Sequence, residues 1–356
     1  MRRICSAFHV NASRPLTCRL PAAAWAQSAM ALSWLVAICA GANLAQAETW
    51  GQKLGYPADK KVLILHADDI GMCYEANQAG KAYLTANQIQ SAALMVPCPW
   101  YNEMADWYQD HAELDLGLHL ALTSEWRWYR WGPVADRAKV PGLIDKEGYL
   151  WKSVQAVAAN ASASEVEAEI RAQVERAIAK GPRPGHIDTH MGTLYARPDY
   201  TRAYMKVAEE YHIPAMVIEQ TPEISERFRK QGYPINDETL QLNKEYKLPK
   251  LDDFFSAPKG ETYEETRDKF FELVRSLKPG ITEIIFHPSV ESEGLKKITN
   301  SWQQRVWEAQ MFADPEIQSF LQREGILFTN WKEMMRRFDA KEEKEKPATG
   351  TLEESK

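Results

Sequence analysis

Residues 62–71 read VLILHADDIG, an aliphatic run that ends in a histidine and two aspartates. Four consecutive aliphatic side chains are typical of a short strand buried on both faces of a parallel sheet. Asp68 and Asp69 follow that strand directly. In folds of alternating strands and helices, functional side chains gather at the carboxyl ends of the strands. The segment therefore predicts a parallel α/β fold that carries chemistry at its first strand end.

The same pattern recurs along the chain. Short runs rich in Val, Ile and Leu alternate with stretches of helical periodicity, which is typical of right-handed βα units. The expected strands are residues 62–66, 90–96, 114–122, 185–189, 215–218, 282–287 and 326–329. Seven strands in this alternation predict a parallel barrel or an open parallel sheet.

Helices are expected between these strands. The clearest is residues 164–180, where Ser164 and Glu167 suit a capping box, an apolar stripe follows, and Gly181 ends the pattern. Others are expected at residues 74–87, 100–111, 199–211, 263–277 and 300–312. Residues 126–150 and 221–259 break the alternation and are interpreted as insertions over a site.

Composition places the chain among globular proteins and excludes several functions. Of its 356 residues, 45% are hydrophobic and 26% charged. The net charge of −6 argues against a nucleic-acid partner. Outside the first 47 residues only Cys73 and Cys98 remain, so neither a disulfide framework nor a CxxC metal site is expected.

The two ends of the chain differ from the body. Residues 1–47 contain four arginines, no acid, an apolar stretch at residues 29–41, and Ala45-Gln46-Ala47 before Glu48. This order is typical of a cleaved secretory signal peptide, and the apolar run is shorter than the ~20 residues of a membrane span. We expect export, to a periplasm, without stable membrane insertion afterwards. An uncleaved anchor or a start codon upstream of the true one are the alternatives.

The body is expected to form one domain, residues 48–339. Residues 340–356 are charged and lack an apolar stripe, so a disordered tail is expected there.

Aspartates and histidines stand at the ends of four expected strands. They are Asp68, Asp69, His119, His186, Asp188, His190 and His287. Each alone has a structural explanation, such as a helix cap or a core histidine. Together they favour a metal site, because two imidazoles and one carboxylate leave coordination positions open for water and substrate. A metal so held acidifies its bound water and polarises a carbonyl, which indicates metal-assisted hydrolysis.

These motifs resemble the YdjC-like carbohydrate deacetylases, the family of chitooligosaccharide deacetylase. The resemblance rests on residues 66–71, 91–97, 117–123, 186–190 and 284–288, in that order. It implies a distorted (β/α) barrel related to NodB-type polysaccharide deacetylases. His66 departs from the family, which usually has Asn there, as do Ile70, where Phe is common, and residues 191–193.

The resemblance also implies roles for individual residues. Asp69, His119 and His190 would bind a divalent metal ion, Mg or Zn. Strand alternation, and not the resemblance, places His186 and Asp188 on the same side as His190, where they are expected to ligate the ion or to hold its ligands in place. Asp68 would be the base that takes a proton from water. His287 would be the acid that protonates the leaving amine.

The implied reaction removes an N-acetyl group from an amino sugar or a short oligosaccharide. Two alternatives remain open. One is a metal-dependent hydrolase of another carbohydrate ester or amide, because fold does not fix function. The other is a non-catalytic exported glycan-binding protein. The sequence predicts neither the natural sugar nor the oligomeric state.

An aromatic stretch, residues 126–131 (WRWYRW), follows the third expected strand. If it is extended, alternation places Trp126, Trp128 and Arg130 on one side. Aromatic rings stack on sugar faces and Arg donates hydrogen bonds to sugar oxygens, so a substrate-binding platform is predicted. The alternative is a loop whose aromatic side chains pack on the barrel rim.

Overall fold

The computed structural model describes residues 47–345. The expected signal peptide, apart from Ala47, and residues 346–356 lie outside this range. Between residues 47 and 345, no helix combines the length and apolar character that a membrane span requires. Cys73 and Cys98 are both buried free thiols.

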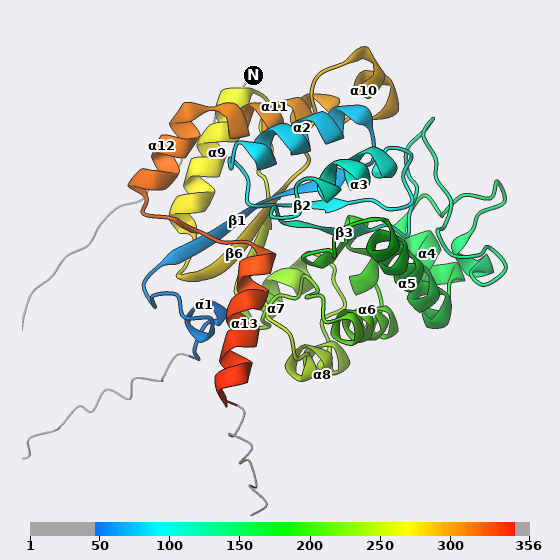
Figure 1. The fold of residues 1–356 in the computed structure, drawn as a ribbon, viewed down its shortest axis with the longest axis horizontal. Helices are drawn as coiled ribbons and strands as arrows, with labels where there is room; N and C mark the ends of the chain where they lie inside the picture. The colour runs from blue at the N-terminus through cyan, green and yellow to red at the C-terminus, as the bar shows by residue number, and fades with distance from the viewer. Residues whose placement is uncertain (1–46, 346–356) are drawn as a thin grey trace, which may run out of the picture. The chain divides into compact units, whose positions relative to one another are not determined.

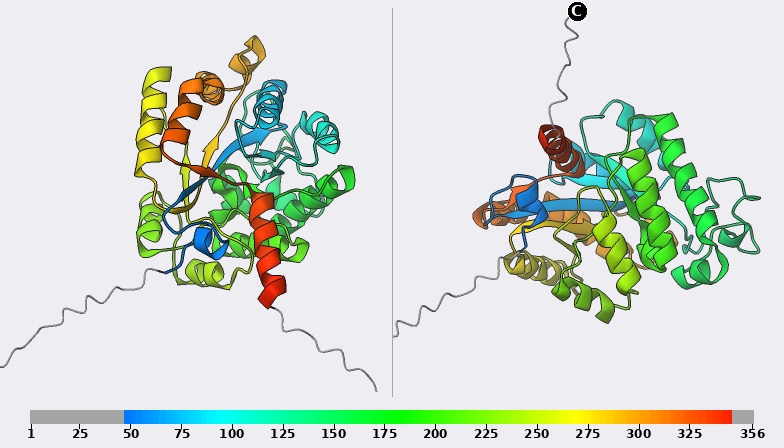
Figure 2. Two further views of the ribbon diagram at one scale, coloured as in Figure 1. Left: turned by 60° about the vertical axis from the view of Figure 1, so that its left-hand side comes forward. Right: turned by 90° about the horizontal axis from the view of Figure 1, so that it is seen from below.

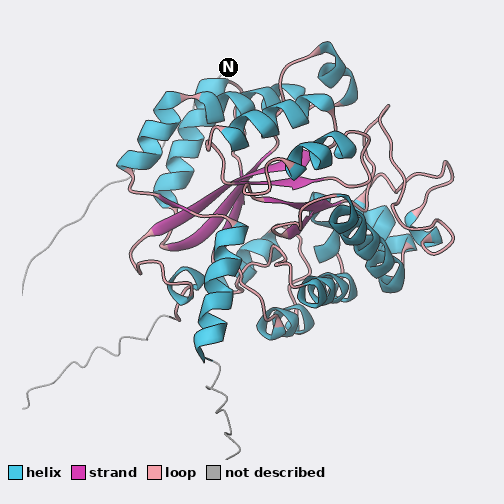
Figure 3. Cartoon of the chain, viewed as in Figure 1, coloured by secondary structure: helices cyan, strands magenta, loops and turns pink. Residues whose placement is uncertain are grey.

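Parallel strands form the centre of the described domain (Figure 3). They are β1 (Lys61–Ile70), β2 (Ser91–Leu94), β3 (Leu116–Leu120), β4 (Ile187–Thr189), β5 (Asp253–Ser256), β6 (Gly280–Phe286) and β7 (Leu327–Phe328). Their order is β4-β3-β2-β1-β6-β5, and β7 pairs with β1 outside this path. Every paired strand runs parallel to its neighbour, which confirms the predicted α/β class.

Isolated bridges join the two outer strands of this order. Ile187 of β4 pairs with Ala215, and Ile218 pairs with Leu251, two residues before β5. The backbone N–H of Leu251 also donates to the carbonyl of Val217 at 2.8 Å. The segment 215–218 thus takes the place of the strand expected there, reduced to bridges, and the wall closes as a distorted barrel.

Helices surround the strands (Figures 1 and 2). In the order of the chain they are α1 (Trp50–Lys53), α2 (Tyr74–Thr85), α3 (Tyr101–Gln109), α4 (Val154–Asn160), α5 (Ala163–Lys180), α6 (Pro198–Tyr211), α7 (Pro222–Lys230), α8 (Asp237–Glu245), α9 (Tyr263–Ser276), α10 (Glu293–Ile298), α11 (Trp302–Ala313), α12 (Pro315–Arg323) and α13 (Trp331–Glu345), with short 3₁₀ helices at Pro141–Leu143 and His190–Tyr195. Helix α11 packs against α2, α9 and α12, while α6 packs against α5 and α8.

Three expectations about these elements were wrong. Helix α5 begins earlier than expected, because Ser162 and Glu165 form its capping box rather than Ser164 and Glu167. Residues 221–259 are not a plain insertion, since they contain α7, α8 and the unexpected strand β5. Helix α13 extends to Glu345, so residues 340–345 are helical rather than part of a disordered tail.

Candidate metal centre and active site

The carboxyl ends of the strands surround a cleft of about 420 Å³. Residues from four strand ends line it, as the sequence predicts. They include Asp68, Asp69, His119, Asp188, His190 and His287, joined by Glu125 and Arg305. The cleft therefore brings the expected chemical groups to one place, with only His186 lying deeper in the barrel.

Asp69, His119 and His190 converge on one point at the base of the cleft. The Nδ1 atom of His190 lies 3.2 Å from Oδ1 of Asp69 and 3.1 Å from Nε2 of His119, and that Nε2 lies 3.5 Å from the same Oδ1. Two ligands that are each about 2.0–2.1 Å from a tetrahedral ion lie roughly 3.3 Å apart. The Asp69 Oδ1 atom is buried and has no hydrogen-bond partner. The three side chains could therefore hold a metal ion.

The backbone of β1 aims Asp69 at this point. Pairing between β1 and β2 shifts register between Ala67 and Ile70, and Asp69 has a φ of 62°. A non-glycine residue in the left-handed region costs free energy and is held there only by its surroundings. The strain sits on a candidate ligand, which is where such strain concentrates in functional sites.

Carboxylates hold both candidate histidine ligands from outside. Asp188 Oδ1 lies 2.5 Å from His119 Nδ1, and Glu125 Oε1 lies 2.9 Å from His190 Nε2. Metal-binding histidines generally use their second ring nitrogen in this way, which fixes the tautomer and the ring orientation. Burial would lower the pKa of His190, but Glu125 and Asp69 raise that pKa to about 10.

Arg305 forms a buried ion pair with Asp69. Its Nη2 atom lies 2.6 Å from Asp69 Oδ2, which leaves Oδ1 directed at the histidines. Burial alone would raise the pKa of Asp69, yet the charges of Arg305 and His190 hold it well below its ordinary value. Asp69 is therefore ionised, as a metal ligand must be.

Asp68 and His287 face each other beside the candidate metal ligands. Asp68 Oδ2 lies 3.9 Å from His287 Nε2. The other ring nitrogen of His287 lies 3.7 Å from Glu308 Oε2, and the His287 backbone N–H donates to that same carboxylate. Burial would raise the pKa of Glu308, but its contacts with His287 lower it. A carboxylate and an oriented imidazole thus stand on one side of the cleft.

Sequence reasoning missed Glu125, Arg305 and Glu308. Arg305 and Glu308 are three residues apart on α11, and both are buried among the apolar side chains of that helix. Arg305 and Glu308 occupy positions of the apolar stripe of this helix, and charged residues at such positions could have indicated buried functional side chains. Glu125 lies in the irregular segment after β3, where the sequence offered no such signal.

The expected platform of Trp126, Trp128 and Arg130 is not one surface. Trp128 is 70% exposed, whereas Trp126 is buried, with the Arg305 guanidinium 5.0 Å from its ring centre. Arg130 is turned inward, where it donates to Asp145 at 2.7 Å and to the Leu150 carbonyl. The stretch bends instead of forming a strand, so alternation does not apply, and none of the three lines the cleft.

Comparison with known proteins places the chain in a family. The family described as YdjC-like protein matches residues 62–323. A carbohydrate deacetylase of Thermus thermophilus is 31% identical over 266 residues, 74% of this chain and 90% of that protein. A carbohydrate deacetylase of Geobacillus stearothermophilus is 26% identical, over 76% of this chain and 96% of its own length.

Among solved structures, a protein of Enterococcus faecalis V583, provisionally described as a cellobiose-phosphate cleavage protein, has the same fold. Its TM-score is 0.63 at 22% identity, and the match covers 78% of this chain and 99% of that one. Sequence and fold agree with the resemblance seen in the five motifs. The chain belongs to the YdjC-like protein family.

Proposed function

We propose that this protein is a metal-dependent carbohydrate deacetylase that hydrolyses the N-acetyl group of an amino sugar or a short oligosaccharide. The observation that carries the proposal is the buried convergence of Asp69, His119 and His190, with Asp68 and His287 beside it. The two carbohydrate deacetylases that match most of the chain support the same reaction.

Each residue has a distinct part in the proposed reaction. Asp69, His119 and His190 would hold the divalent ion, which when bound would lower the pKa of a water and polarise the acetyl carbonyl. Asp68 takes the proton of the attacking water, since it lines the cleft and its Oδ2 atom lies 3.9 Å from His287 Nε2. His287 donates a proton to the departing nitrogen, so that the C–N bond breaks to give acetate and a free amine. Glu308 orients His287 for this transfer.

The donor set limits the choice of metal. Two imidazoles and one carboxylate suit first-row transition metals and Zn²⁺ better than Mg²⁺, which prefers oxygen ligands and keeps several waters. We propose a divalent ion, Zn²⁺ or Mg²⁺, and the nitrogen donors favour Zn²⁺.

We further propose that the protein acts after export. The support is the composition of residues 1–47, in which arginines precede an apolar stretch and an Ala-x-Ala site. Acetylated glycans in a periplasm would then be the substrate pool.

Acetate release tests the proposal directly. Metal-stripped protein is reconstituted with a single metal and given N-acetylated oligosaccharides, with O-acetylated sugars of matched length beside them. The expected result is acetate from the N-acetylated set, lost in His119→Ala and retained in His111→Ala, because His111 bonds to a backbone carbonyl at a helix end. Acetate release from the O-acetylated sugars alone would show that the protein hydrolyses acetyl esters and not N-acetyl amides.

A further inference from the structure

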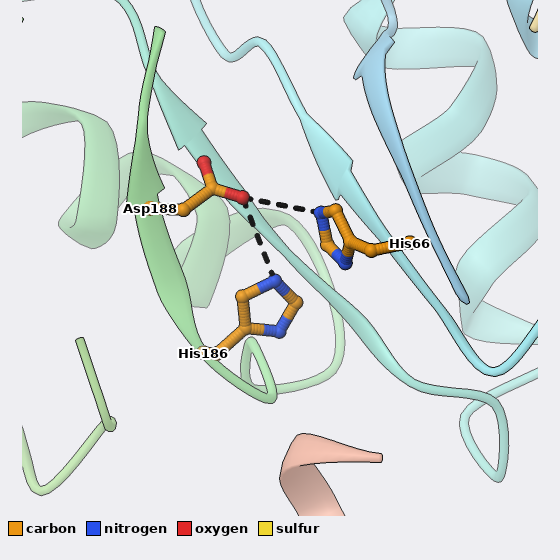
Figure 4. Close-up of side chains that lie close together, drawn as sticks. All are labelled: His66, His186 and Asp188. Carbon is orange, nitrogen blue, oxygen red and sulfur yellow. Dashed lines mark ion pairs between the residues drawn. The ribbon is translucent and has the colours of Figure 1, made fainter. Parts of the chain in front are cut away.

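A second group of titratable side chains lies behind the candidate active site. His66 of β1, His186 before β4 and Asp188 of β4 point toward one another inside the barrel (Figure 4). Neither imidazole is exposed to solvent, and neither lines the cleft. The proposed deacetylation uses neither His66 nor His186.

The ligand atoms of this group are spaced as atoms around a shared ion. Asp188 Oδ2 lies 3.2 Å from His66 Nε2 and 3.8 Å from His186 Nε2. Asp68 Oδ1 lies 3.1 Å from the same His66 nitrogen. These separations fall around the roughly 3.3 Å expected between ligands of a tetrahedral ion about 2.0–2.1 Å away.

These four atoms are buried without hydrogen-bond partners. They are His66 Nε2, His186 Nε2, Asp188 Oδ2 and Asp68 Oδ1. His66 Nε2 lies 3.1 Å from Asp68 and 3.2 Å from Asp188 without a hydrogen bond to either, and His186 Nε2 is too far from Asp188 to form one. Buried polar groups are costly unless satisfied, and a cation between His66, His186 and Asp188 would satisfy the three atoms of these residues. Asp69 Oδ1, in the candidate active site, shows the same signature.

The far side of each imidazole faces a further carboxylate. His186 Nδ1 lies 3.7 Å from Asp115 Oδ1, and His66 Nδ1 lies 4.0 Å from Glu283 Oε2. Both carboxylates are fixed by Trp331, whose backbone N–H donates to Asp115 at 2.8 Å and whose indole N–H donates to Glu283 at 2.7 Å. Neither Nδ1 atom forms a hydrogen bond at these distances, but each has a carboxylate on the side where a metal-binding histidine usually has one.

Among the described residues, the carboxylates around this group are paired only with histidines. Four buried carboxylates surround the two imidazoles: Asp68, Asp115, Asp188 and Glu283. Among residues 47–345, no lysine or arginine forms an ion pair with any of these four. Uncompensated buried charge is strongly unfavourable, and a divalent cation supplies the missing positive charge.

We propose that His66, His186 and Asp188 form a second, fully enclosed site for a divalent transition-metal ion, Zn²⁺ by its donor set. The ion braces the barrel interior. It also fixes Asp188, whose other oxygen orients His119. Gly117 of β3 leaves the space for this arrangement, because a Cβ at that position would overlap the His186 ring. The proposal stands apart from the deacetylase activity and does not depend on it.

Burial of the site makes a distinctive prediction about metal exchange. An ion in the cleft is open to a chelator, whereas an ion between His66 and His186 leaves only when the barrel opens. Protein expressed with added Zn²⁺ should contain about two ions per chain by elemental analysis. EDTA treatment of the folded protein should leave about one, and EDTA in urea should remove both.

Variants assign the retained ion to its ligands. His66→Asn and His186→Asn each keep a polar group near the Nδ1 position and lose the Nε2 atom, so each should retain no ion after EDTA treatment. His119→Ala should lose only the ion that EDTA removes. His212→Asn is the matched control, because His212 is exposed and pairs with Asp339 on the surface.

The outcomes decide between a metal and a proton network. The proposal would be overturned if wild-type protein, grown with Zn²⁺, Co²⁺ or Ni²⁺ and then treated with EDTA, contained no metal. In that case protonated histidines would balance the charge of the buried carboxylates. Retention of the ion in both asparagine variants would overturn the ligand assignment. If one variant fails to fold, wild-type retention and the other variant still decide. Because ions are counted here and acetate is measured in the other test, the two proposals fail separately.

Discussion

Replacement of Arg305 by methionine should destabilise the metal-free protein strongly. Arg305 is 8% exposed and Asp69 is 1% exposed, and Arg305 Nη2 lies 2.6 Å from Asp69 Oδ2. Methionine keeps much of the apolar length of arginine and removes only the charged end. Loss of one partner from a buried ion pair costs about 3–5 kcal/mol when the other charge stays buried and unpaired. Because His190 still lies 3.2 Å from Asp69, the loss should fall toward the lower end of that range. This is a large share of the roughly 5–15 kcal/mol that stabilises a typical domain.

The pH dependence of this loss has a fixed sign. Arg305 keeps the pKa of Asp69 below its ordinary value, so the ionised form contributes stability above the unfolded pKa. That contribution is lost as pH falls through the folded pKa. In Arg305→Met, only the histidines still oppose burial, so the pKa of Asp69 should be higher than in wild type, and the variant gains stability relative to wild type as Asp69 takes up a proton. The difference in unfolding free energy should therefore narrow from pH 8 to pH 5.

Urea unfolding of chelator-treated protein at several pH values measures this difference. Arg202→Met is the matched control, because Arg202 and Glu238 form an ion pair at 3.0 Å with side chains 55% and 52% exposed. Exposed pairs contribute about 0–1 kcal/mol. A loss below about 1 kcal/mol in Arg305→Met, equal to that of the control, would refute the argument that Arg305 holds a buried charge. So would a difference that widens toward acidic pH.

Four further predictions concern the site, the loop and the leader. Asp68→Asn should keep the metal in the cleft while kcat falls about 10²–10⁴-fold, whereas Asp69→Asn should lose metal affinity. Elemental analysis measures the metal content of each variant and acetate release measures its kcat. The opposite pattern would exchange the roles of the two aspartates. Without metal the pKa of His190 is about 10, so metal binding displaces a proton from this imidazole. The apparent metal affinity, measured by competition with a chelator, should therefore rise about tenfold per pH unit from pH 6 to 8. A metal affinity independent of pH would contradict this prediction. Trp128 is 70% exposed and outside the cleft, so only a substrate that extends beyond the cleft could contact it. Trp128→Ala should therefore raise KM for oligosaccharides and spare a small acetylated substrate, with metal content unchanged, and equal losses for both substrates would exclude a sugar contact. Mass spectrometry of exported protein should give Glu48 as the first residue, and a mature chain that begins near Met1 would defeat the export proposal.

The sequence predicted the positions of the site better than the partners of its residues. Strands with aliphatic runs, such as β1 and β6, were recognisable, and their ends located Asp69, His119 and His287. Parallel topology then brings these residues together, because all strand ends meet at one rim. Periodicity therefore predicted the convergence of the candidate ligands.

Residues held by long-range contacts were beyond that reasoning. Arg305 reaches Asp69 across 236 positions of the chain, and no local pattern records such a pair. Strand β5 has only four residues, two of them polar, and so resembles a loop. Trp126 and Arg130 were misplaced because alternation holds only for an extended backbone, and this segment bends.

The position of Trp331 has a consequence for how the protein is made. This residue begins the final helix, yet it donates to Asp115 and Glu283, which lie 216 and 48 positions earlier. During synthesis from the N-terminus, Asp115 and Glu283 lack these two donors until Trp331 has left the ribosome. A chain that stops before residue 331 leaves both carboxylates without these donors in an apolar interior. Interrupted translation products should therefore be poor at reaching a stable fold, which exposes them to proteolysis before they can bind substrate.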